Sequence, residues 1–426
     1  MSIIRTTWWT GFSVGIRLLA GLSLNKILAI LVGPGGYATI GQFQNAVQLI
    51  FTVCGGAINN GVTKFTAEYE SDEHRQASLW STATRIILIA SAAMAVLLTI
   101  FNRPLAAYFL RDAALGSVFI WLAASITLFS LNTMLMAILN GKKDLRTYVF
   151  VNIGGSILIL LAMAALTRFF GLYGALIAVA TNQAVLFFLT LLLCRRKLWF
   201  RLCLFSAPFS RTVALGLFGF AVMAGVSAFA NNGGQIAVPL LLVREFGTET
   251  AGLWDGMIKI SQLNMMLVAQ AMAFYFLPRI AELQSWEEIR AEIWQGGRFI
   301  VPLFAAAAVA AFILRDIIIL TLFTREFLPM EELFAWQLAG DTVRVGSWFL
   351  AYVMIGKAMI RTYVATEVLT NAVFVVVSHL LVTRVGFGGV AIAHFLTYAA
   401  ALVGMYVAVA RNRALPRLII PKGENR

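Results

Sequence analysis

The chain has 426 residues, of which 60% are hydrophobic and 12% are charged. Soluble domains have roughly 45–50% apolar and 25% charged residues, so this composition excludes an ordinary soluble protein and indicates a chain that crosses a membrane many times. Apolar runs longer than ~18 residues, the length that marks a bilayer-spanning helix, fill most of the sequence. The longest stretches between them, about 278–298 and 194–211, are shorter than the ~50 residues of a small domain. A catalytic domain outside the bilayer is therefore excluded.

The net charge of +13 would suggest nucleic acid binding in a soluble protein. In a membrane protein, however, Lys and Arg gather on cytoplasmic loops, so we expect no nucleic acid partner. Cys54, Cys194 and Cys203 have no paired spacing, and the sequence predicts neither a disulfide framework nor a metal site. The N-terminal segment lacks a small-residue cleavage pattern, and we interpret it as a retained first helix.

The hydrophobic pattern predicts an all-α fold with twelve transmembrane helices. In chain order they cover residues 7–32, 43–63, 79–101, 115–139, 148–168, 172–193, 212–243, 251–277, 298–323, 333–357, 363–383 and 388–410. The Gly-Pro-Gly-Gly segment 33–36 is predicted to form a tight turn. It lacks the Gly-Lys-Ser/Thr that completes a nucleotide-binding loop, so we expect neither ATP hydrolysis nor a cofactor.

Two segments are predicted to depart from simple spans. The span 212–243 would be ~48 Å long, against a hydrocarbon core of ~30 Å. It is expected either to break at Asn231–Gly234 and Pro239 or to end near residue 230 in a partly buried loop. Apolar and charged residues alternate over 286–293, which predicts an amphipathic helix on the cytoplasmic surface.

The distribution of basic residues predicts the orientation. An even number of spans places both termini on one side of the membrane. With residues towards the span ends counted with the adjoining loops, segments on that side hold 21 of the 33 Lys and Arg residues, the opposite loops hold 7, and 5 are assigned to span interiors. Because basic residues favour the inside, both termini are predicted to be cytoplasmic.

A duplication at an offset of about 215 residues predicts two halves. Gly141, Lys142, Arg146, Thr147, Tyr148 and Val149 recur as Gly356, Lys357, Arg361, Thr362, Tyr363 and Val364, and Gly171 and Gly174 recur as Gly386 and Gly389. The predicted domains are six-helix bundles at 1–197 and 212–426, joined by a basic cytoplasmic linker at 198–211. Six spans return the chain to its starting side, so a pseudo-two-fold axis along the membrane normal should relate the bundles, with a substrate cavity between them.

Charged residues inside predicted spans are the candidate binding residues, since each costs ~2.5–3.5 kcal/mol on insertion scales and by default marks a pathway. Besides histidines they are Arg17, Lys26, Arg85, Asp255, Lys259, Asp341, Arg344 and Glu367. The five positive and three negative charges leave a surplus of two, which favours an anion with about two negative charges, such as a pyrophosphate diester.

The spacing of these residues leaves alternatives open. Asp255 and Lys259 are four apart and Asp341 and Arg344 three apart, so each pair fits either an ion pair on one helix face or substrate contacts. Arg85 and Glu367 lie near cytoplasmic helix ends, where snorkelling explains them as well.

Two basic residues of the first span have no acidic residue one turn away. Arg17 lies ~15 Å deep and needs a partner or a ligand. Lys26 lies on the opposite face of an ideal helix, and snorkelling to the outer interface is its alternative explanation. Elsewhere, His379 and His394 fit either a proton relay or satisfied interior side chains.

Four segments resemble a known family: GPGGYATIGQFQNAV at 33–47, NNGVTKFTAEY at 59–69, LPRIAEL at 277–283 and LFAWQLAGDTVRVG at 333–346. They are similar to the Wzx-type polysaccharide flippases of the multidrug/oligosaccharidyl-lipid/polysaccharide (MOP) exporter superfamily, in the branch that serves enterobacterial common antigen synthesis. The resemblance covers nearly the whole chain. It implies two six-helix bundles in a MATE-like V shape.

The resemblance also implies a function without catalytic residues. Such proteins move an undecaprenyl-pyrophosphate-linked oligosaccharide, for instance lipid III or an O-antigen repeat unit, from the cytoplasmic to the periplasmic leaflet of the bacterial inner membrane. Membrane lipid, a polysaccharide polymerase and a chain-length regulator are the further partners it suggests. By position, Arg17, Lys26 and Lys259 match the basic residues that related flippases use.

Two other functions remain open from the sequence. An ion-coupled multidrug exporter of the same superfamily should have an acidic cavity, whereas the embedded charge here is positive. A polytopic glycan ligase or polymerase would need catalytic residues on a large outer loop, and the predicted outer loops are short.

Overall fold

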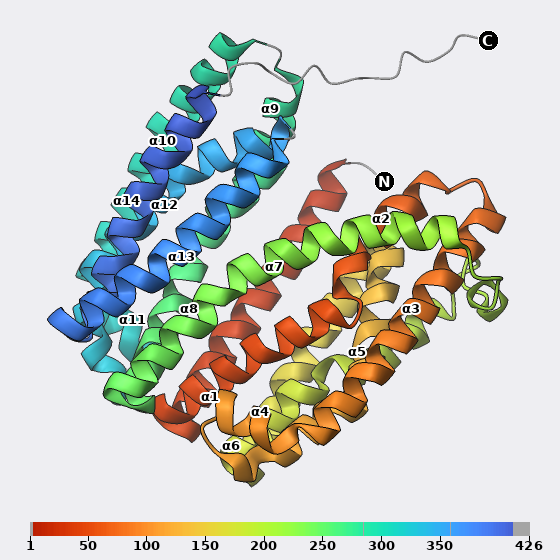
Figure 1. The fold of residues 1–426 in the computed structure, drawn as a ribbon, viewed down its shortest axis with the longest axis horizontal. Coiled ribbons are helices and arrows are strands. Elements are labelled where there is room, and N and C mark those ends of the chain that lie inside the picture. The colour runs from red at the N-terminus through yellow and green to blue at the C-terminus, as the bar shows by residue number, and fades with distance from the viewer. Residues whose placement is uncertain (1–2, 284, 358, 412–426) are drawn as a thin grey trace. The chain divides into compact units, whose positions relative to one another are not determined.

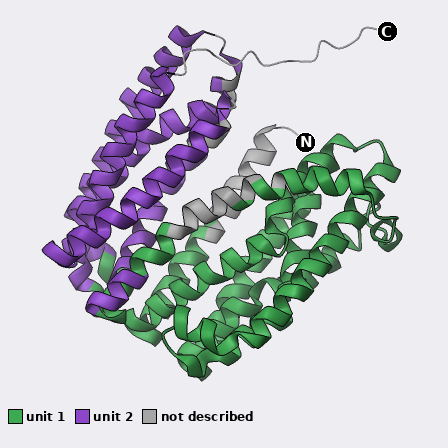
Figure 2. Ribbon diagram, viewed as in Figure 1, with its two compact units in different colours: residues 1–239, 247–252, 319–327 green, residues 240–246, 253–318, 328–426 purple. Residues whose placement is uncertain are grey.

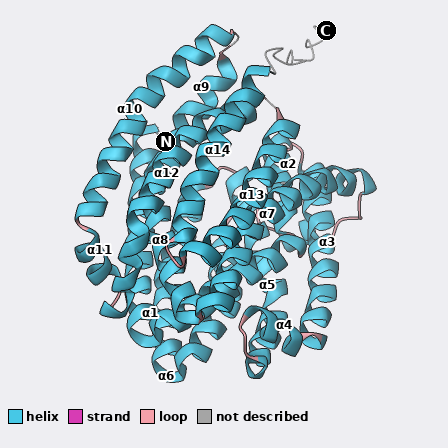
Figure 3. Cartoon of the chain, turned by 60° about the vertical axis from the view of Figure 1, so that its left-hand side comes forward, coloured by secondary structure: helices cyan, strands magenta, loops and turns pink. Residues whose placement is uncertain are grey.

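The computed structural model describes residues 3–283, 285–357 and 359–411, and the side chains of some helical residues, Arg17 among them, lie outside the description. Every regular element in this part of the chain is a helix (Figures 1 and 3). The all-helical fold predicted from the composition is confirmed for these residues.

The first two predicted spans belong to one element, α1 (Ile3–Val53). A straight helix of 51 residues would be ~76 Å long, but Gly33 interrupts it with φ 63° and ψ −174°, and the chain turns back there (Figure 1). A side chain resists this backbone conformation, which glycine adopts freely. The predicted turn therefore lies at Gly33, and the second arm ends at Val53 rather than near residue 63.

The remaining helices of the first half follow the order of the predicted spans. After η1 (Gly56–Ile58) and α2 (Asn59–Glu68) come α3 (Glu73–Ile100), α4 (Asn102–Phe109), η2 (Ala113–Leu115), α5 (Gly116–Gly141) and α6 (Leu145–Cys194). Gly171, with φ 58° and ψ −141°, divides α6 into two arms. These arms match the predicted spans 148–168 and 172–193.

Helix α7 (Arg211–Phe246) is continuous through 231–239, so both predicted alternatives for this segment, a break or an end near residue 230, are wrong. Asn and Gly each lower helix propensity by about 1 kcal/mol or less. Pro239 removes one backbone hydrogen bond. Pro in a helix interior costs ~3 kcal/mol relative to Ala, yet α7 continues through all of these residues.

The second half contains α8 (Thr248–Ala271), the π-helical η4 (Met272–Phe276), α9 (Leu277–Glu282), α10 (Trp286–Ile313), α11 (Arg315–Leu322), η5 (Arg325–Met330), α12 (Glu331–Gly356), α13 (Ile360–Val385) and α14 (Gly389–Arg411). The helix predicted at 286–293 is present, but it is continuous with the span that follows it. Ser285 and Glu288 form a capping box that starts α10 at Trp286, and these residues are its first turns.

Seven stretches among the described residues are long and apolar enough to cross a membrane: Leu18–Val53, Glu73–Ile100, Ala113–Gly141, Arg146–Cys194, Trp286–Ile313, Arg361–Val385 and Gly389–Arg411. The protein is therefore a multi-pass membrane protein. Helices α8 and α12, which carry Asp255, Lys259, Asp341 and Arg344, are not among the seven. The count of twelve spans stays a prediction.

The sequence duplication is also visible in the backbone. Helices α5 and α12 have 26 residues each and begin 215 positions apart, at Gly116 and Glu331. Lys142 donates its backbone N–H to the carbonyls of residues 138 and 140, and Lys357 donates to those of residues 353 and 355. The equivalent helices α5 and α12 therefore end with the same pattern of backbone hydrogen bonds.

Contacts divide the chain into two compact units (Figure 2). Unit 1 consists of residues 1–239, 247–252 and 319–327, and unit 2 of residues 240–246, 253–318 and 328–426. The division differs from the boundary predicted at 198–211, because most of α7 belongs to unit 1. The two six-helix domains stay a prediction.

Candidate functional site

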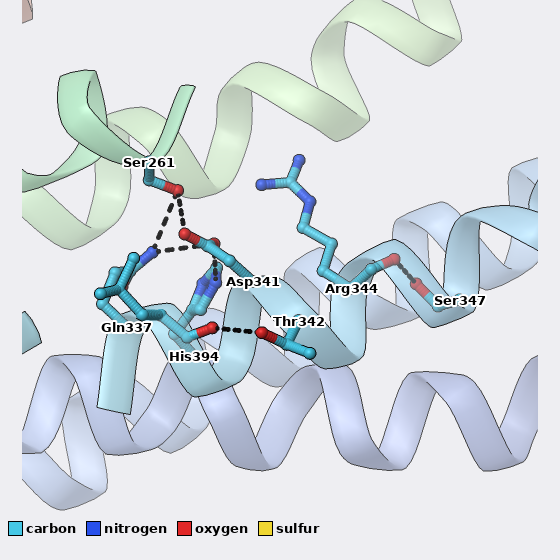
Figure 4. Close-up of polar contacts among 8 residues, drawn as sticks. Ser261, Gln337, Asp341, Thr342, Arg344, Ser347 and His394 are labelled. Carbon is cyan, nitrogen blue, oxygen red and sulfur yellow. Dashed lines mark hydrogen bonds and ion pairs between the residues drawn. The ribbon is translucent and has the colours of Figure 1, made fainter. Parts of the chain in front are cut away.

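A fully buried acid lies in unit 2: the side chain of Asp341 on α12 has no exposed surface. Ser261 of α8 donates its hydroxyl to Oδ2 at 2.6 Å, and Gln337 donates Nε2 to Oδ1 at 3.3 Å. Nε2 of His394, on α14, lies 3.0 Å from Oδ1 (Figure 4). Removing a carboxylate from water costs several kcal/mol, and these contacts from three helices offset that cost.

Arg344 lies one turn from Asp341 on α12 but does not pair with it. Its guanidinium lies over the ring of Tyr398 at 4.9 Å and over that of Trp348 at 5.8 Å, and no dashed line joins it to Asp341 in Figure 4. The interpretation of Asp341 and Arg344 as an intrahelical ion pair is therefore wrong. Three other groups already contact the carboxylate, and aromatic faces attract a guanidinium by ~0.5–2 kcal/mol.

Arg344 retains unused hydrogen-bonding capacity. Its Nε is buried without a hydrogen-bond partner in this structure. Glu367 on α13 interacts with it electrostatically, although no ion pair between them is formed among the described residues. A guanidinium has five N–H donors, so this one is suited to an anionic ligand.

Asp255 and Lys259 lie one turn apart on α8 and attract each other electrostatically. Among the described residues their side chains form no ion pair or hydrogen bond, and Oδ2 of Asp255 is buried without a partner. The intrahelical ion pair between Asp255 and Lys259 is therefore not formed, and substrate contact stays a prediction for both residues.

Lys26 of α1 binds protein backbone within unit 1. Its Nζ donates to the carbonyl of Leu320 at 2.6 Å and to that of Phe323, at the end of α11. Cations are favourable at this end of a helix because carbonyls and the helix dipole concentrate negative charge there. The structure thus provides a third explanation for Lys26, beside substrate binding and snorkelling: it caps α11.

Arg85 on α3 is exposed and donates Nη2 to the carbonyl of Ala207 at 3.0 Å. Ser81 donates to the same carbonyl, and Thr82 accepts from the backbone N–H of Ser210 at 3.1 Å. These contacts hold the segment 198–211 against α3. Arg85 is thus not brought together with Asp341 or Arg344.

Arg17 lies on α1, but its side chain is outside the described residues, and its role stays a prediction. Of the eight charged candidates, Asp341 and Arg344 both contact side chains of α14, through His394 and Tyr398, while Glu367 interacts electrostatically with Arg344. Sequence reasoning missed Ser261, Gln337 and Tyr398 as partners of Asp341 and Arg344. Gln337 precedes Asp341 by four residues and Tyr398 follows His394 by four, so helical spacing could have found these two.

Further polar atoms in unit 2 are buried without hydrogen-bond partners: Asp255 Oδ2, Asn264 Nδ2, Gln337 Oε1, Ser378 Oγ and Thr397 Oγ1. Each such atom costs ~1–3 kcal/mol if it stays unsatisfied. This polar interior is suited to water or a polar ligand. The described residues contain no group of His, Cys, Asp and Glu side chains that could hold a metal ion.

Solved structures of two transporters have a fold similar to that of this chain. An inward-facing MATE multidrug resistance transporter of the MOP superfamily aligns with a TM-score of 0.77 and 13% identity, over 93% of this chain and 95% of its own. The lipid II flippase MurJ, in an inward closed conformation, aligns with a TM-score of 0.73 and 14% identity, over 96% and 87%. At these identities the likeness shows the fold alone.

Proteins of similar sequence include a flippase and a putative transporter. The lipid III flippase of Escherichia coli (strain K12) is 27% identical over 398 residues, 93% of this chain and 96% of the relative. A putative O-antigen transporter of Shigella flexneri is 30% identical over 166 residues, 37% and 38% of the two chains. A family model described as "Polysaccharide biosynthesis protein" matches residues 27–332.

The chain is a multi-pass membrane protein whose fold is that of the MATE and MurJ transporters, and its sequence relatives are a flippase and a putative transporter rather than enzymes. Because the family model matches well over half of its length, the chain belongs to the polysaccharide biosynthesis protein family. The resemblance to Wzx-type flippases is confirmed, and neither of these relatives is named as a glycan ligase or polymerase.

Proposed function

We propose that this protein is a flippase for an undecaprenyl-pyrophosphate-linked oligosaccharide, such as lipid III or an O-antigen repeat unit. It moves the substrate from the cytoplasmic to the periplasmic leaflet of the bacterial inner membrane by alternating access, and no bond is made or broken. Twelve spans in two six-helix bundles, related by a pseudo-two-fold axis along the membrane normal, and cytoplasmic termini belong to this proposal. The names of the sequence relatives support it.

The observation that carries the proposal is Arg344. Its guanidinium is not neutralised by Asp341, and Nε is buried without an acceptor. A diphosphate supplies several acceptor oxygens, and guanidinium groups bind phosphate in a bidentate manner. Arg344 therefore binds the pyrophosphate, while the prenyl chain stays in the bilayer.

The other candidates take different roles. Arg17 and Lys259 offer positive charge to the substrate anion, and Asp255 attracts the ammonium group of Lys259. Lys26 and Arg85 act through the backbone carbonyls they bind, so they position helices and do not contact the substrate. A polysaccharide polymerase and a chain-length regulator are the proposed protein partners.

A second function, ion-coupled export of cationic drugs, is favoured by the fold shared with MATE transporters and by the buried acid Asp341. It predicts a site in which carboxylates bind the substrate. Asp341 already accepts from Ser261 and Gln337 and contacts His394, which argues against this alternative.

The test measures binding of farnesyl diphosphate and farnesyl monophosphate to the full-length protein in lipid nanodiscs. We expect preference for the diphosphate, loss of that preference in Arg344→Ala and partial retention in Arg344→Lys. Arg384→Ala is the matched control, because Arg384 is exposed near the end of α13. Equal binding of both probes, or equal binding by wild type and Arg344→Ala, contradicts the proposed anion site.

A further inference from the structure

The contact between Asp341 and His394 is distinctive because both side chains are buried, with exposed fractions of 0% and 4%. Asp341 is the acid on α12 and His394 the base on α14, with Oδ1 and Nε2 3.0 Å apart. It is the one contact between an acidic and a basic side chain, among those formed by the described residues, in which neither partner reaches solvent. Ionisable groups within a membrane protein mark proton or ion pathways by default.

The geometry fixes where a proton can be added. Oδ2 of Asp341 accepts from Ser261, and Oδ1 accepts from Gln337. An ionised carboxylate only accepts, so Nε2 of His394 must carry the hydrogen that it shares with Oδ1. In a neutral imidazole the other nitrogen, Nδ1, is then unprotonated. A single proton taken up at Nδ1 gives imidazolium, and the net charge of the pair changes from −1 to 0.

We propose that Asp341 and His394 form a proton-binding site whose occupancy sets the availability of Arg344 for the substrate anion. This inference rests on the proposed function. With the proton bound, His394 neutralises Asp341, and Arg344 stays over Tyr398, ready for a diphosphate. When the proton leaves, the buried carboxylate lacks a countercharge and attracts Arg344, which is three residues further along α12.

The surroundings of the pair support this exchange. Arg344 is the charged residue adjacent to Asp341 on α12, and the ring of Tyr398 lies 4.7 Å from that of His394 and 4.9 Å from the guanidinium. From α13, Glu367 interacts electrostatically with both Arg344 and Tyr398. Movement of Arg344 towards Asp341 would exchange aromatic contacts for an ion pair that becomes favourable after deprotonation.

Charged groups elsewhere on the helices of unit 2 are engaged with other partners or exposed. On α8, Asp255 and Lys259 attract each other. Arg279 of α9 forms ion pairs with Glu282 and with Glu292 of α10, and Lys357, after α12, donates to the carbonyl of Leu283. Tyr352 of α12 and Tyr363 of α13 are half-buried phenols. The other charged residues and the other histidine of α10, α12, α13 and α14 are exposed: Glu287, Glu288, Arg290, Arg298, Glu331, Glu332, Arg361, His379, Arg384 and Arg411.

The first experiment titrates the histidines. The chain has three, His74, His379 and His394, and the first two are exposed, so nuclear magnetic resonance of the full-length, histidine-labelled protein in nanodiscs gives few signals. We expect one signal that is lost in His394→Gln, shifts with pH in the wild type and titrates at a different pH in Asp341→Asn. A His394 signal that does not change with pH, or that ignores Asp341→Asn, overturns the proposal.

The second experiment measures farnesyl diphosphate binding across the same pH range. We expect wild-type affinity to fall several-fold more steeply towards alkaline pH than that of His394→Gln, because the titration of the probe itself is common to both proteins. His379→Gln is the matched control and should behave as the wild type. Unchanged signals from His74 and His379 show that His394→Gln is folded.

The two experiments separate this inference from the proposed function. Diphosphate binding with the same pH profile in wild type and His394→Gln overturns the proton site and leaves the flippase proposal intact. A His394 signal that titrates and responds to Asp341→Asn, in a protein that does not bind diphosphate, refutes the anion site of the flippase and the coupling through Arg344, while proton binding itself stands.

Discussion

Lys26 and Leu320 are joined across 294 positions of sequence, because the ammonium group of Lys26 donates to the Leu320 carbonyl at 2.6 Å. The contact ties α1 to the C-terminal end of α11 within unit 1. Nearby, the ring of Tyr37 meets those of Phe323 and Phe327 edge-on, with centroids 5.7 Å apart in each case. A lysine that sequence analysis assigned to substrate binding therefore also has a structural partner.

The first prediction concerns the contact between Lys26 and the end of α11. Lys26→Met removes the donor from the end of α11, so the thermal midpoint of the purified protein should fall, with a cost of up to ~2 kcal/mol for a partly buried cation at a helix end. Lys26→Arg retains the charge and should keep most of the stability. If Lys26→Met leaves the thermal midpoint unchanged while export is lost, Lys26 contacts substrate rather than capping α11.

Arg17→Ala should show the opposite behaviour. We expect export of the lipid-linked glycan to be abolished in cells while membrane insertion, protein level and thermal midpoint are retained, because the proposed role of Arg17 is to bind the substrate anion. The measurement is complementation of a strain that lacks its own flippase, with immunoblotting of membranes as the control. Full complementation by Arg17→Ala would remove Arg17 from the site.

Asp144 provides a prediction about pH. Burial alone would raise the pKa of this carboxyl, but hydrogen bonds from Lys197 and Thr147 outweigh burial and lower the pKa. Lys197 lies 2.7 Å from Oδ2, and the backbone N–H of Thr147 donates at 3.2 Å at the start of α6. Because the folded-state pKa is depressed, this stabilisation is present above the unfolded pKa of about 3.9 and is lost as pH falls through the folded value.

Asp144→Ala should therefore lower the thermal midpoint at neutral pH, with ~1 kcal/mol from the lost helix cap alone. The difference from wild type should shrink as pH falls below about 4. Asp72→Ala is the control, since Asp72 caps α3 through the N–H of Arg75 with a more exposed side chain. A difference that stays constant from neutral to acidic pH would show that the ionised form of Asp144 is unimportant.

The glycines that end or divide helices provide a backbone prediction. Gly386 has φ 91° at the end of α13, and no heavy atom lies within 4 Å of a Cβ built there, so Gly386→Ala adds strain without a clash. Its ψ of −157° places it in an extended, positive-φ region that is essentially restricted to glycine and costs other residues about 1–3 kcal/mol, so the thermal midpoint should fall accordingly. Gly21→Ala is the control, because Gly21 is helical and equally open, and it should be neutral or stabilising. Equal effects of both substitutions would contradict the strain at Gly386.

Local features of the fold could be predicted from the sequence, and distant contacts could not. Gly171 and Gly386 occupy equivalent places in the repeat, and both have positive φ because the same turn follows the same helix in each half. By contrast, the break predicted in α7 is absent, and the unfavourable helix propensities of Asn, Gly and Pro do not end this helix. The contact of Asp341 with His394 could not be predicted, because helical spacing offers Arg344, three residues away, as an ion-pair partner, whereas His394 lies 53 positions away.

The absence of an ion pair between Asp341 and Arg344 can be tested with a charge swap. If Asp341 and Arg344 formed an ion pair, exchanging them as Asp341→Arg with Arg344→Asp would restore the function that either single substitution abolishes. We expect no restoration, because the swap places a guanidinium, which has no acceptor, against the donors of Ser261, Gln337 and His394. Export and thermal midpoint of the two single variants and the double variant are the measurements. Recovery of both in the double variant would mean that the two charges pair in a conformation that governs transport, and that the contact with His394 is dispensable.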